Sequence, residues 1–334
     1  MKKIAINGFG RIGRAAFKIA LEHTDEIEVV AINDLFDTQT LAYLLKYDTV
    51  YGIYPKTVTH TEQSLIVDGK ELKIFSEREP EKLPWGALGV HTVIESTGVF
   101  RTAETMERHL KAGAKQVILS APPKEGVKSA ISTHVLGVSD IEKDPNPLKS
   151  CASCTTNSIA PVVDVIHKNL GIKKATLTTV HGYTADQNLV DAPHKDFRRG
   201  RAAAENIVPT STGAAISVTE VIPDLVGKFD GIALRVPVAV GSLSDVTILL
   251  ERTTTKEEVN ALLKQASESP QYKGILGVTE DKIVSSDILQ TSYSGIVDLS
   301  MTQVVDGDLL KILSWYDNEW GYTSRLIEAV IRSI

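Results

Sequence analysis

The chain has 334 residues, of which 43% are hydrophobic and 23% are charged; this excludes a disordered or fibrous protein. At roughly 150 residues per domain, the length favours two domains. The formal net charge of −6 argues against nucleic acid or an anionic membrane as the main partner. No apolar run approaches the ~18 residues of a membrane span. Two cysteines in a chain of this length favour the reducing cytoplasm over a disulfide-stabilised secreted protein.

The first half of the chain alternates short β-rich runs with helical stretches. We expect helices over 11–22 and 102–112, and strands over 2–7, 27–32, 92–95 and 116–120. Alternation of this kind is typical of a parallel sheet built from βαβ units. The Pro- and Asn-rich segment 144–147 is the expected domain boundary.

The second half is richer in strands. We expect β-strands over 174–181, 231–240, 243–252, 295–298 and 309–316, with a hairpin at Asp306-Gly307. Helices over 212–221 and 255–267 then lie on one face of a mixed or mostly antiparallel sheet. The last 14 residues, after Trp320, form an amphipathic helix that we expect to return to the first domain.

A glycine motif directly follows the first strand. Gly8, Gly10 and Gly13 form G-x-G-x-x-G at the start of a helix, where the glycines allow a tight turn, close approach of a pyrophosphate and close helix packing. Asp34 ends the second strand, where a carboxylate can bind ribose hydroxyls and repel a 2′-phosphate. This context predicts a Rossmann-type α/β domain that prefers NAD to NADP, and a plain glycine turn is the alternative.

Two cysteines precede a helical run in the second half. Cys151 and Cys154 form C-x-x-C, but no second pair of ligands accompanies them, so a metal site is not expected. A cysteine at a helix N-terminus is expected to have a lowered pKa. His181, at the end of a strand, is the candidate base for Cys154. A dithiol pair and a structural histidine stay open as alternatives.

The motifs together resemble one family. The chain carries, in the family's order, NGFGRIGR, SCTTN, HGYT, PTSTGAA, RVP and WYDNEWGY. It is therefore similar to phosphorylating glyceraldehyde-3-phosphate dehydrogenase from about residue 4 to about residue 325. The resemblance implies an NAD-binding Rossmann-type domain over 1–150 and 317–334. It also implies an α+β catalytic domain over 151–316.

The resemblance also implies residue roles. Cys154 matches the nucleophile and His181 the base, while Cys151 matches no catalytic position and is expected to be a small buried thiol. Arg235 serves both anions: it holds the substrate's C3 phosphate with Thr184, and the attacking phosphate with Ser153, Thr155, Thr212 and Gly213. Cofactor contacts are implied for Gly8, Gly10, Arg11, Ile12, Gly13, Asp34, Arg78, Thr97, Ser120, Asn318 and Tyr322.

The activity implied is oxidation of D-glyceraldehyde 3-phosphate to 1,3-bisphosphoglycerate with NAD and inorganic phosphate, through a hemithioacetal and a thioester. The basic loop 183–206 resembles the S-loop, which implies a cytoplasmic homotetramer. Erythrose-4-phosphate dehydrogenase, or a non-catalytic NAD-binding redox sensor, are the alternatives.

Two positions depart from the family pattern. Asp191-Ala192-Pro193 has Ala192 where NAD-specific members carry Leu, as plastid-type dual-cofactor members do. Repulsion between the Asp34 carboxylate and the 2′-phosphate of NADP costs roughly 1–4 kcal/mol of binding free energy. We therefore expect Asp34 to outweigh Ala192, with NAD preferred and some NADP use. Gly137-Val138-Ser139-Asp140 replaces Gly-Val-Asn-x, for which we have no explanation.

Overall fold

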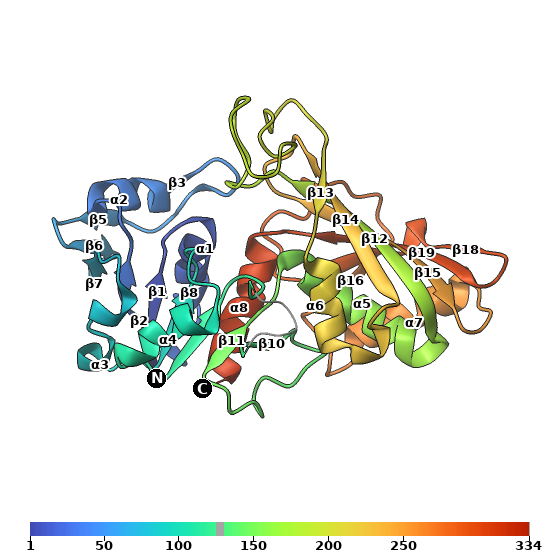
Figure 1. Ribbon diagram of the computed structural model, residues 1–334, viewed down its shortest axis with the longest axis horizontal. Coiled ribbons are helices and arrows are strands. Elements are labelled where there is room, and N and C mark those ends of the chain that lie inside the picture. The colour runs from blue at the N-terminus through green and yellow to red at the C-terminus, as the bar shows by residue number, and fades with distance from the viewer. Residues whose placement is uncertain (125–129, 334) are drawn as a thin grey trace. The chain divides into compact units, whose positions relative to one another are not determined.

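A computed structural model describes residues 1–124 and 130–333 of the chain, which divides into two compact units (Figure 1). Unit 1 comprises Met1–His134, Asp140–Ala152 and the residues from Leu326 onward, and unit 2 comprises Val135–Ser139 and Ser153–Arg325. The sequence placed all of 317–334 in the first domain, whereas the units divide the last helix, α8 (Trp320–Arg332), after Arg325.

Unit 1 contains a nine-stranded sheet within the described residues, in the order β10-β11-β9-β8-β1-β2-β7-β6-β5. Neighbours from β10 to β7 are parallel, and β6 and β5 add an antiparallel edge. The strands are β1 (Lys2–Asn7), β2 (Ile27–Asn33), β5 (Val58–His60), β6 (Ser64–Val67), β7 (Lys70–Phe75), β8 (Thr92–Glu95), β9 (Gln116–Leu119), β10 (Ser132–Thr133) and β11 (Leu148–Ser150). The four expected strands are confirmed.

Helices connect these parallel strands, as expected. They are α1 (Arg11–Ala20), α2 (Thr38–Lys46), α3 (Trp85–Leu88) and α4 (Ala103–Lys111), with a short hairpin of β3 (Tyr47–Asp48) and β4 (Gly52–Ile53) after α2. The central strand β1 is flanked by β2 on one side and β8 on the other, so the strand order reverses at β1. Ligands of open α/β sheets bind at the carboxyl ends of strands at such a point.

The expected boundary at 144–147 is wrong. This segment leads directly into β11, which pairs with β9 in the sheet of unit 1. Proline and asparagine mark a turn there rather than a linker, because the chain stays in unit 1 from Asp140 to Ala152 and continues into the main part of unit 2 at Ser153.

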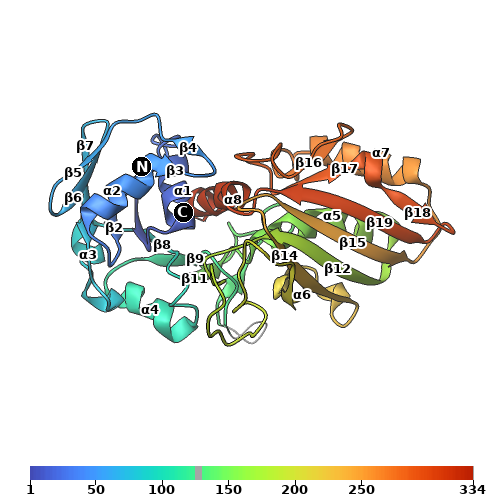
Figure 2. The ribbon, with the colours of Figure 1, turned by 90° about the horizontal axis from the view of Figure 1, so that it is seen from above.

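Unit 2 contains an eight-stranded mixed sheet within the described residues, seen from above in Figure 2. Its order is β13-β14-β12-β15-β19-β17-β16, and β18 pairs with β19. The strands are β12 (Ile172–Gly182), β13 (Val208–Ser211), β14 (Phe229–Val236), β15 (Ser242–Leu250), β16 (Leu276–Thr279), β17 (Gly295–Asp298), β18 (Gln303–Val305) and β19 (Leu309–Tyr316). This confirms the mixed α+β half of the predicted fold class.

Strands β15 and β19 alternate between buried and half-buried residues, so one face of this sheet is covered. The covering helices are α5 (Cys154–Leu170), α6 (Ala214–Val221) and α7 (Lys256–Glu268). Helix α5 packs across the middle strands, α6 against β14 and α7 against β16. Asp306 and Gly307, both at positive φ (49° and 78°), form the expected hairpin turn between β18 and β19. No helix in the described part of the chain is long and apolar enough to cross a membrane.

Candidate active site

Three strands of unit 2 bring polar side chains to one edge of the sheet. β12 and β14 are parallel neighbours. β12 and β19 each pair antiparallel with β15, so β19 runs in the same direction as β12. The carboxyl ends of all three strands therefore meet. His181 of β12 lies directly opposite Arg235 of β14, and Tyr316 ends β19 with its ring 6.0 Å from that of His181.

The thiol of Cys154 reaches this edge from the first turn of α5. Ser153 caps the helix, because its Oγ accepts a hydrogen bond from the backbone N of Thr156 at 3.0 Å. Cys154 Sγ lies 3.4 Å from His181 Nε2. The structure thus brings together the two residues that the sequence paired.

Arg235 places a fixed positive charge behind the histidine. Its Nη1 lies 2.6 Å from His181 Nδ1 and donates to the carbonyl O of Gly182 at 3.1 Å. Burial and the Arg235 charge lower the pKa of His181 to about 3, so the ring is neutral at pH 7. With the ring proton on Nδ1, which donates to the Gly182 carbonyl O at 2.7 Å, Nε2 is the nitrogen that can accept a proton.

The expectation of a lowered Cys154 pKa is not met. Burial raises the pKa of this thiol, while Arg235 and hydrogen bonds from Thr155 act in the opposite direction without overcoming burial. Cys154 and His181 are accordingly a neutral thiol–imidazole pair. Cys151 is buried, as expected, and burial raises its pKa to about 12, so it is not readily deprotonated.

Tyr316 was missed by the sequence analysis. Its hydroxyl lies 2.8 Å from Thr155 Oγ1 and 2.7 Å from Thr179 Oγ1, so it ties the first turn of α5 to β12. Burial raises the pKa of Tyr316, which keeps the phenol neutral. Its signal in the sequence was its place in the motif WYDNEWGY, from which only Asn318 and Tyr322 were assigned roles.

The candidate anion-binding residues lie at two adjoining helix N-termini. Thr156 Oγ1 lies 3.5 Å from the carbonyl O of Ala214, which joins the first turn of α5 to the first turn of α6. Gly213 is the N-cap of α6, and Thr212 Oγ1 accepts from the Ala214 backbone N. Two helix N-termini beside Arg235 favour phosphate. Thr184 follows β12 two residues after Gly182.

A cavity of about 420 Å³ in unit 1 opens at the carboxyl ends of β1, β2 and β8. Among its lining residues, Gly8, Gly10, Asp34, Arg78 and Thr97 were predicted from the sequence. A Cβ on Gly8 would lie 2.7 Å from the Thr97 backbone N, and one on Gly13 only 2.0 Å from the Gly8 carbonyl O. A Cβ on Gly10, by contrast, would enter open space, which is where a pyrophosphate must approach. The glycines therefore fit a dinucleotide.

Asp34 is held rigidly at this cavity. Its Oδ2 accepts from the Phe9 backbone N at 2.7 Å and its Oδ1 from the Phe36 backbone N at 3.1 Å. Each carboxylate oxygen retains a lone pair for a ribose hydroxyl.

Four predicted cofactor residues of unit 1 lie outside the cavity lining: Arg11, Ile12, Gly13 and Ser120. The Arg11 guanidinium bonds to Asp48 through Nη1, and its backbone lies at the start of α1. Ile12 follows on the first turn of α1, and Ser120 comes directly after β9, where its backbone N donates to the Glu95 carbonyl O.

Asn318 and Tyr322 lie in unit 2, grouped with the thiol rather than with Asp34. Asn318 Oδ1 accepts from the Gly241 backbone N and from Ser242 Oγ, and Ser242 Oγ in turn accepts from the Gly182 backbone N. This chain of hydrogen bonds fixes the amide of Asn318 relative to β12 and leaves its Nδ2 as a donor. Tyr322 is buried in α8.

The two halves match two family models of glyceraldehyde 3-phosphate dehydrogenase: residues 2–103 its NAD binding domain, and residues 153–318 its C-terminal domain. The chain belongs to the glyceraldehyde-3-phosphate dehydrogenase family. Similar proteins with that name include those of Thermotoga maritima (55% identity; 99% of this chain and 98% of the relative), Streptomyces coelicolor (52%; 98% and 97%) and Geobacillus stearothermophilus (49%; 98% and 96%). The resemblance stated from the motifs is confirmed, and NAD is the cofactor of this family's N-terminal domain.

Proposed function

We propose that this protein oxidises D-glyceraldehyde 3-phosphate to 1,3-bisphosphoglycerate, with NAD and inorganic phosphate as co-reactants. The observation that carries the proposal is the 3.4 Å approach of Cys154 Sγ to His181 Nε2 beside Arg235, at two helix N-termini. The family assignment gives the substrate class, and this geometry supplies the chemistry.

In the first step the thiol adds to the aldehyde. Sγ forms a bond to the carbonyl carbon, and His181 Nε2 takes the thiol proton and returns it to the carbonyl oxygen, which gives a hemithioacetal. The backbone N of Cys154, at the N-terminus of α5, is suited to stabilise the developing oxyanion.

In the second step the hemithioacetal is oxidised. The dinucleotide, held by the residues that line the cavity of unit 1, would supply the hydride acceptor for this carbon. His181 accepts the hydroxyl proton as the C–O double bond forms, leaving a thioester on Cys154 and a protonated ring. The imidazole is neutral before this step, so its Nε2 has a lone pair that can receive the proton.

In the third step phosphate attacks the thioester carbon. The tetrahedral intermediate collapses with cleavage of the C–S bond, releasing the acyl phosphate, and the thiolate recovers a proton from His181. Ser153, Thr155, Thr212 and Gly213 are proposed to hold the attacking phosphate, and Thr184 with Arg235 the C3 phosphate. Neutral hydroxyl and amide donors, together with one arginine, can position the phosphate without so much positive charge that it no longer reacts.

For the cofactor, we propose contacts from residues that line the cavity of unit 1; the family resemblance adds Asn318 and Tyr322. The backbone amides of Gly10, Arg11, Ile12 and Gly13 suit the pyrophosphate, Asp34 suits the ribose, and Arg78, Thr97 and Ser120 complete the set. NAD is preferred, with some NADP use through Ala192. A kcat/KM ratio that favours NADP would contradict this preference.

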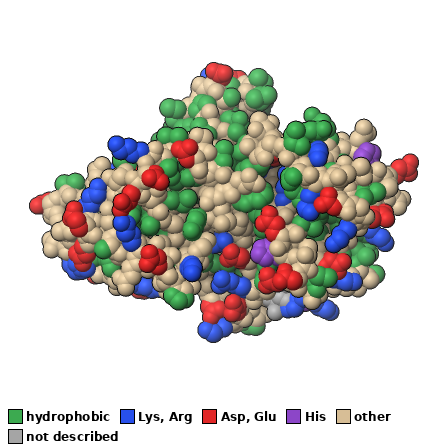
Figure 3. All heavy atoms as spheres, turned by 180° about the vertical axis from the view of Figure 1, so that it is seen from behind, with side chains coloured by type: hydrophobic (Ala, Val, Ile, Leu, Met, Phe, Trp, Pro, Cys, Tyr) green, Lys and Arg blue, Asp and Glu red, His purple; other side chains and the backbone are tan. Residues whose placement is uncertain are grey.

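We further propose that residues 1–150 and 317–334 form the NAD-binding domain and that residues 151–316 form the catalytic domain. We also propose a cytoplasmic homotetramer whose subunits pack through the S-loop. Leu189 and Phe197 of that loop are 78% and 89% exposed. Apolar side chains gather on the loop at the top of Figure 3. Exposed apolar groups of this kind favour burial against another subunit. Arg199 and Arg201 of the basic cluster bond to Asp186 and Asp191, so they order the loop.

The test is NADH formation from glyceraldehyde 3-phosphate with and without phosphate. We expect turnover only with phosphate, and none in Cys154→Ser. Phosphate-independent turnover, or a faster reaction with erythrose 4-phosphate, would contradict the proposed substrate and acceptor. Absence of any turnover with intact NAD binding would indicate a redox sensor.

A further inference from the structure

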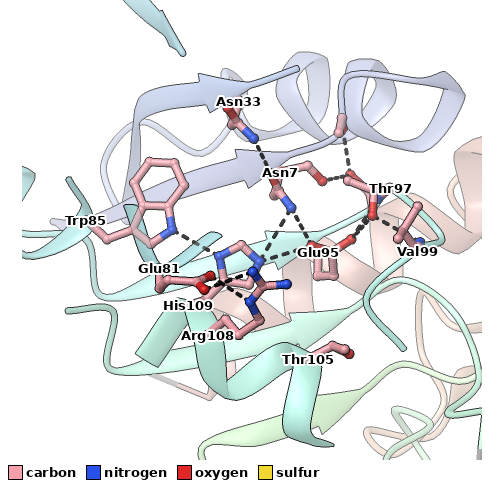
Figure 4. Close-up of polar contacts among 12 residues, drawn as sticks. Asn7, Asn33, Glu81, Trp85, Glu95, Thr97, Val99, Thr105, Arg108 and His109 are labelled. Atoms are coloured by element: carbon pink, nitrogen blue, oxygen red, sulfur yellow. Dashed lines mark hydrogen bonds and ion pairs between the residues drawn. The ribbon is translucent and has the colours of Figure 1, made fainter. Parts of the chain in front are cut away.

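A buried polar cluster lies beneath the cavity of unit 1, and no step of the proposed reaction uses it (Figure 4). Its centre is Glu95 at the end of β8, which is fully buried. Four donors converge on this carboxylate: the backbone N and the hydroxyl of Thr97 on Oε1, and Asn7 Nδ2 and His109 Nε2 on Oε2. Such an arrangement suits a group that accepts at both oxygens.

The donors of this cluster are neutral groups. Trp85 Nε1 donates to His109 Nδ1 at 3.0 Å, and an indole can only donate. His109 Nδ1 therefore carries a lone pair, and the ring proton is on Nε2, directed to Glu95 at 3.1 Å. The hydrogen bond from Trp85 to Nδ1 thus keeps His109 as a neutral donor to Glu95 through Nε2.

The carboxylate sets the direction of a chain of hydrogen bonds across the cavity floor. Because Glu95 only accepts, Asn7 must present Nδ2 at 2.5 Å, and its Oδ1 then accepts from Asn33 Nδ2 at 2.7 Å. Asn33 in turn makes two hydrogen bonds to the backbone of Glu77. Its Oδ1 accepts from the Glu77 backbone N at 2.8 Å, and its Nδ2 donates to the Glu77 carbonyl O at 2.9 Å. The chain thus joins the ends of β8, β1 and β2 to the segment that carries Arg78.

Both ends of this chain are walls of the cavity. Thr97 lines one side, and Glu77 and Arg78 line the other, next to Asp34. Thr97 is held by Glu95 directly, and Glu77 is held by Glu95 through two amides. A single buried carboxylate therefore controls the spacing between the two walls.

We propose that Glu95 is a positioning residue for the dinucleotide: through Thr97 and the Asn7–Asn33 amides it holds the two walls of the adenosine-binding part of the cavity at the separation that NAD requires. The proposal rests on the assignment of this cavity as the dinucleotide site. Glu95 itself touches no reacting atom, so its effect is on cofactor affinity rather than on the chemical step.

The direct test is Glu95→Gln. A carboxamide that faces Thr97 with its oxygen turns its Nε2 toward Asn7 Nδ2 and His109 Nε2–H, so donor opposes donor, and the amide chain reverses or breaks. We expect NAD affinity, measured by calorimetry, to fall roughly 10- to 100-fold. The KM for NAD rises by the same factor, while kcat at saturating NAD stays within about threefold. Glu107→Gln, the same change at an exposed position of α4, is the matched control.

A rescue variant distinguishes the loss of donor–acceptor matching in the cluster from a general loss of folding. In Asn7→Asp/Glu95→Gln the carboxylate moves to position 7, where it can accept from Gln at 95, from Asn33 Nδ2 and from His109 Nε2, which lies 3.4 Å from the native Asn7 Nδ2. Asn7→Asp alone sets two carboxylates together. We expect the double variant to bind NAD at least tenfold more tightly than Asn7→Asp, a comparison that holds even if Glu95→Gln alone does not fold.

Two results would overturn the proposal: a folded Glu95→Gln protein with the NAD affinity of the Glu107→Gln control, or a double variant that binds no better than Asn7→Asp. Asp34→Ala distinguishes the proposal from the site assignment beneath it. If Asp34→Ala weakens NAD binding and Glu95→Gln does not, the positioning role alone fails. If Asp34→Ala has no effect, the assignment of the cavity fails.

Discussion

Removal of the Arg235 charge tests the electrostatics of the thiol–imidazole pair. Arg235 Nη1 lies 2.6 Å from His181 Nδ1, and His181 Nε2 lies 3.4 Å from Cys154 Sγ, so one imidazole ring separates the guanidinium from the sulfur. At about 8 Å and an effective dielectric constant of about 20, the attraction between guanidinium and thiolate is about 2 kcal/mol. Arg235→Leu should therefore raise the pKa of the thiol by about 1.5 units.

The assay is the pH dependence of Cys154 alkylation by iodoacetamide, which reports the thiolate fraction. We expect the midpoint to move up by about 1.5 units in Arg235→Leu and by less than about 0.5 unit in Arg235→Lys, which keeps the charge. Arg201→Leu, at an exposed ion pair of the S-loop, should leave the midpoint unchanged. An unchanged or lower midpoint in Arg235→Leu would refute the argument that this charge acts on the sulfur.

Three further outcomes follow from the structure. His181→Asn should lower kcat by roughly 10²- to 10⁴-fold while Cys154 remains alkylatable; near-normal turnover would mean that another group is the base. Since the folded pKa of His181 is about 3 and the unfolded value about 6.5, the unfolded state binds the proton first as pH falls. This group should therefore remove about 2 kcal/mol of stability between pH 7 and pH 5, seen in urea unfolding and absent in His181→Asn. Tyr316→Phe should cost about 1–3 kcal/mol, because two buried threonine hydroxyls lose their shared partner; an unchanged urea midpoint would contradict that bridge.

The sequence predicted those parts of the fold that depend on local pattern. The βαβ order, the glycine motif and the Asp306-Gly307 hairpin each depend on residues close in the chain, and each is confirmed. The boundary at 144–147 failed because proline and asparagine mark turns whether or not a domain ends there. Only the long-range pairing of β11 with β9 reveals that the segment stays in unit 1.

The sequence predicted the site residues that stand in motifs, and it missed the properties and residues that depend on burial. Cys154 and His181 stand in recognisable motifs, but the sign of the thiol's pKa shift depends on burial, which no spacing reveals. Glu95 and His109 are 14 residues apart in the sequence and lie on different elements, β8 and α4, and neither stands in a motif. Their roles arise from complete burial beside each other beneath the cavity. Long-range contacts of this kind are set by packing and have no local signature.

The central claim is that the aldehyde is oxidised while it is covalently held on Cys154 and is released only by phosphate. The most direct measurement is rapid-mixing NADH formation with excess glyceraldehyde 3-phosphate in phosphate-free buffer. The account predicts a burst of about one NADH per Cys154 that then stops, and a second rise when phosphate is added. Continued turnover without phosphate, or a full burst in Cys154→Ser, would contradict it.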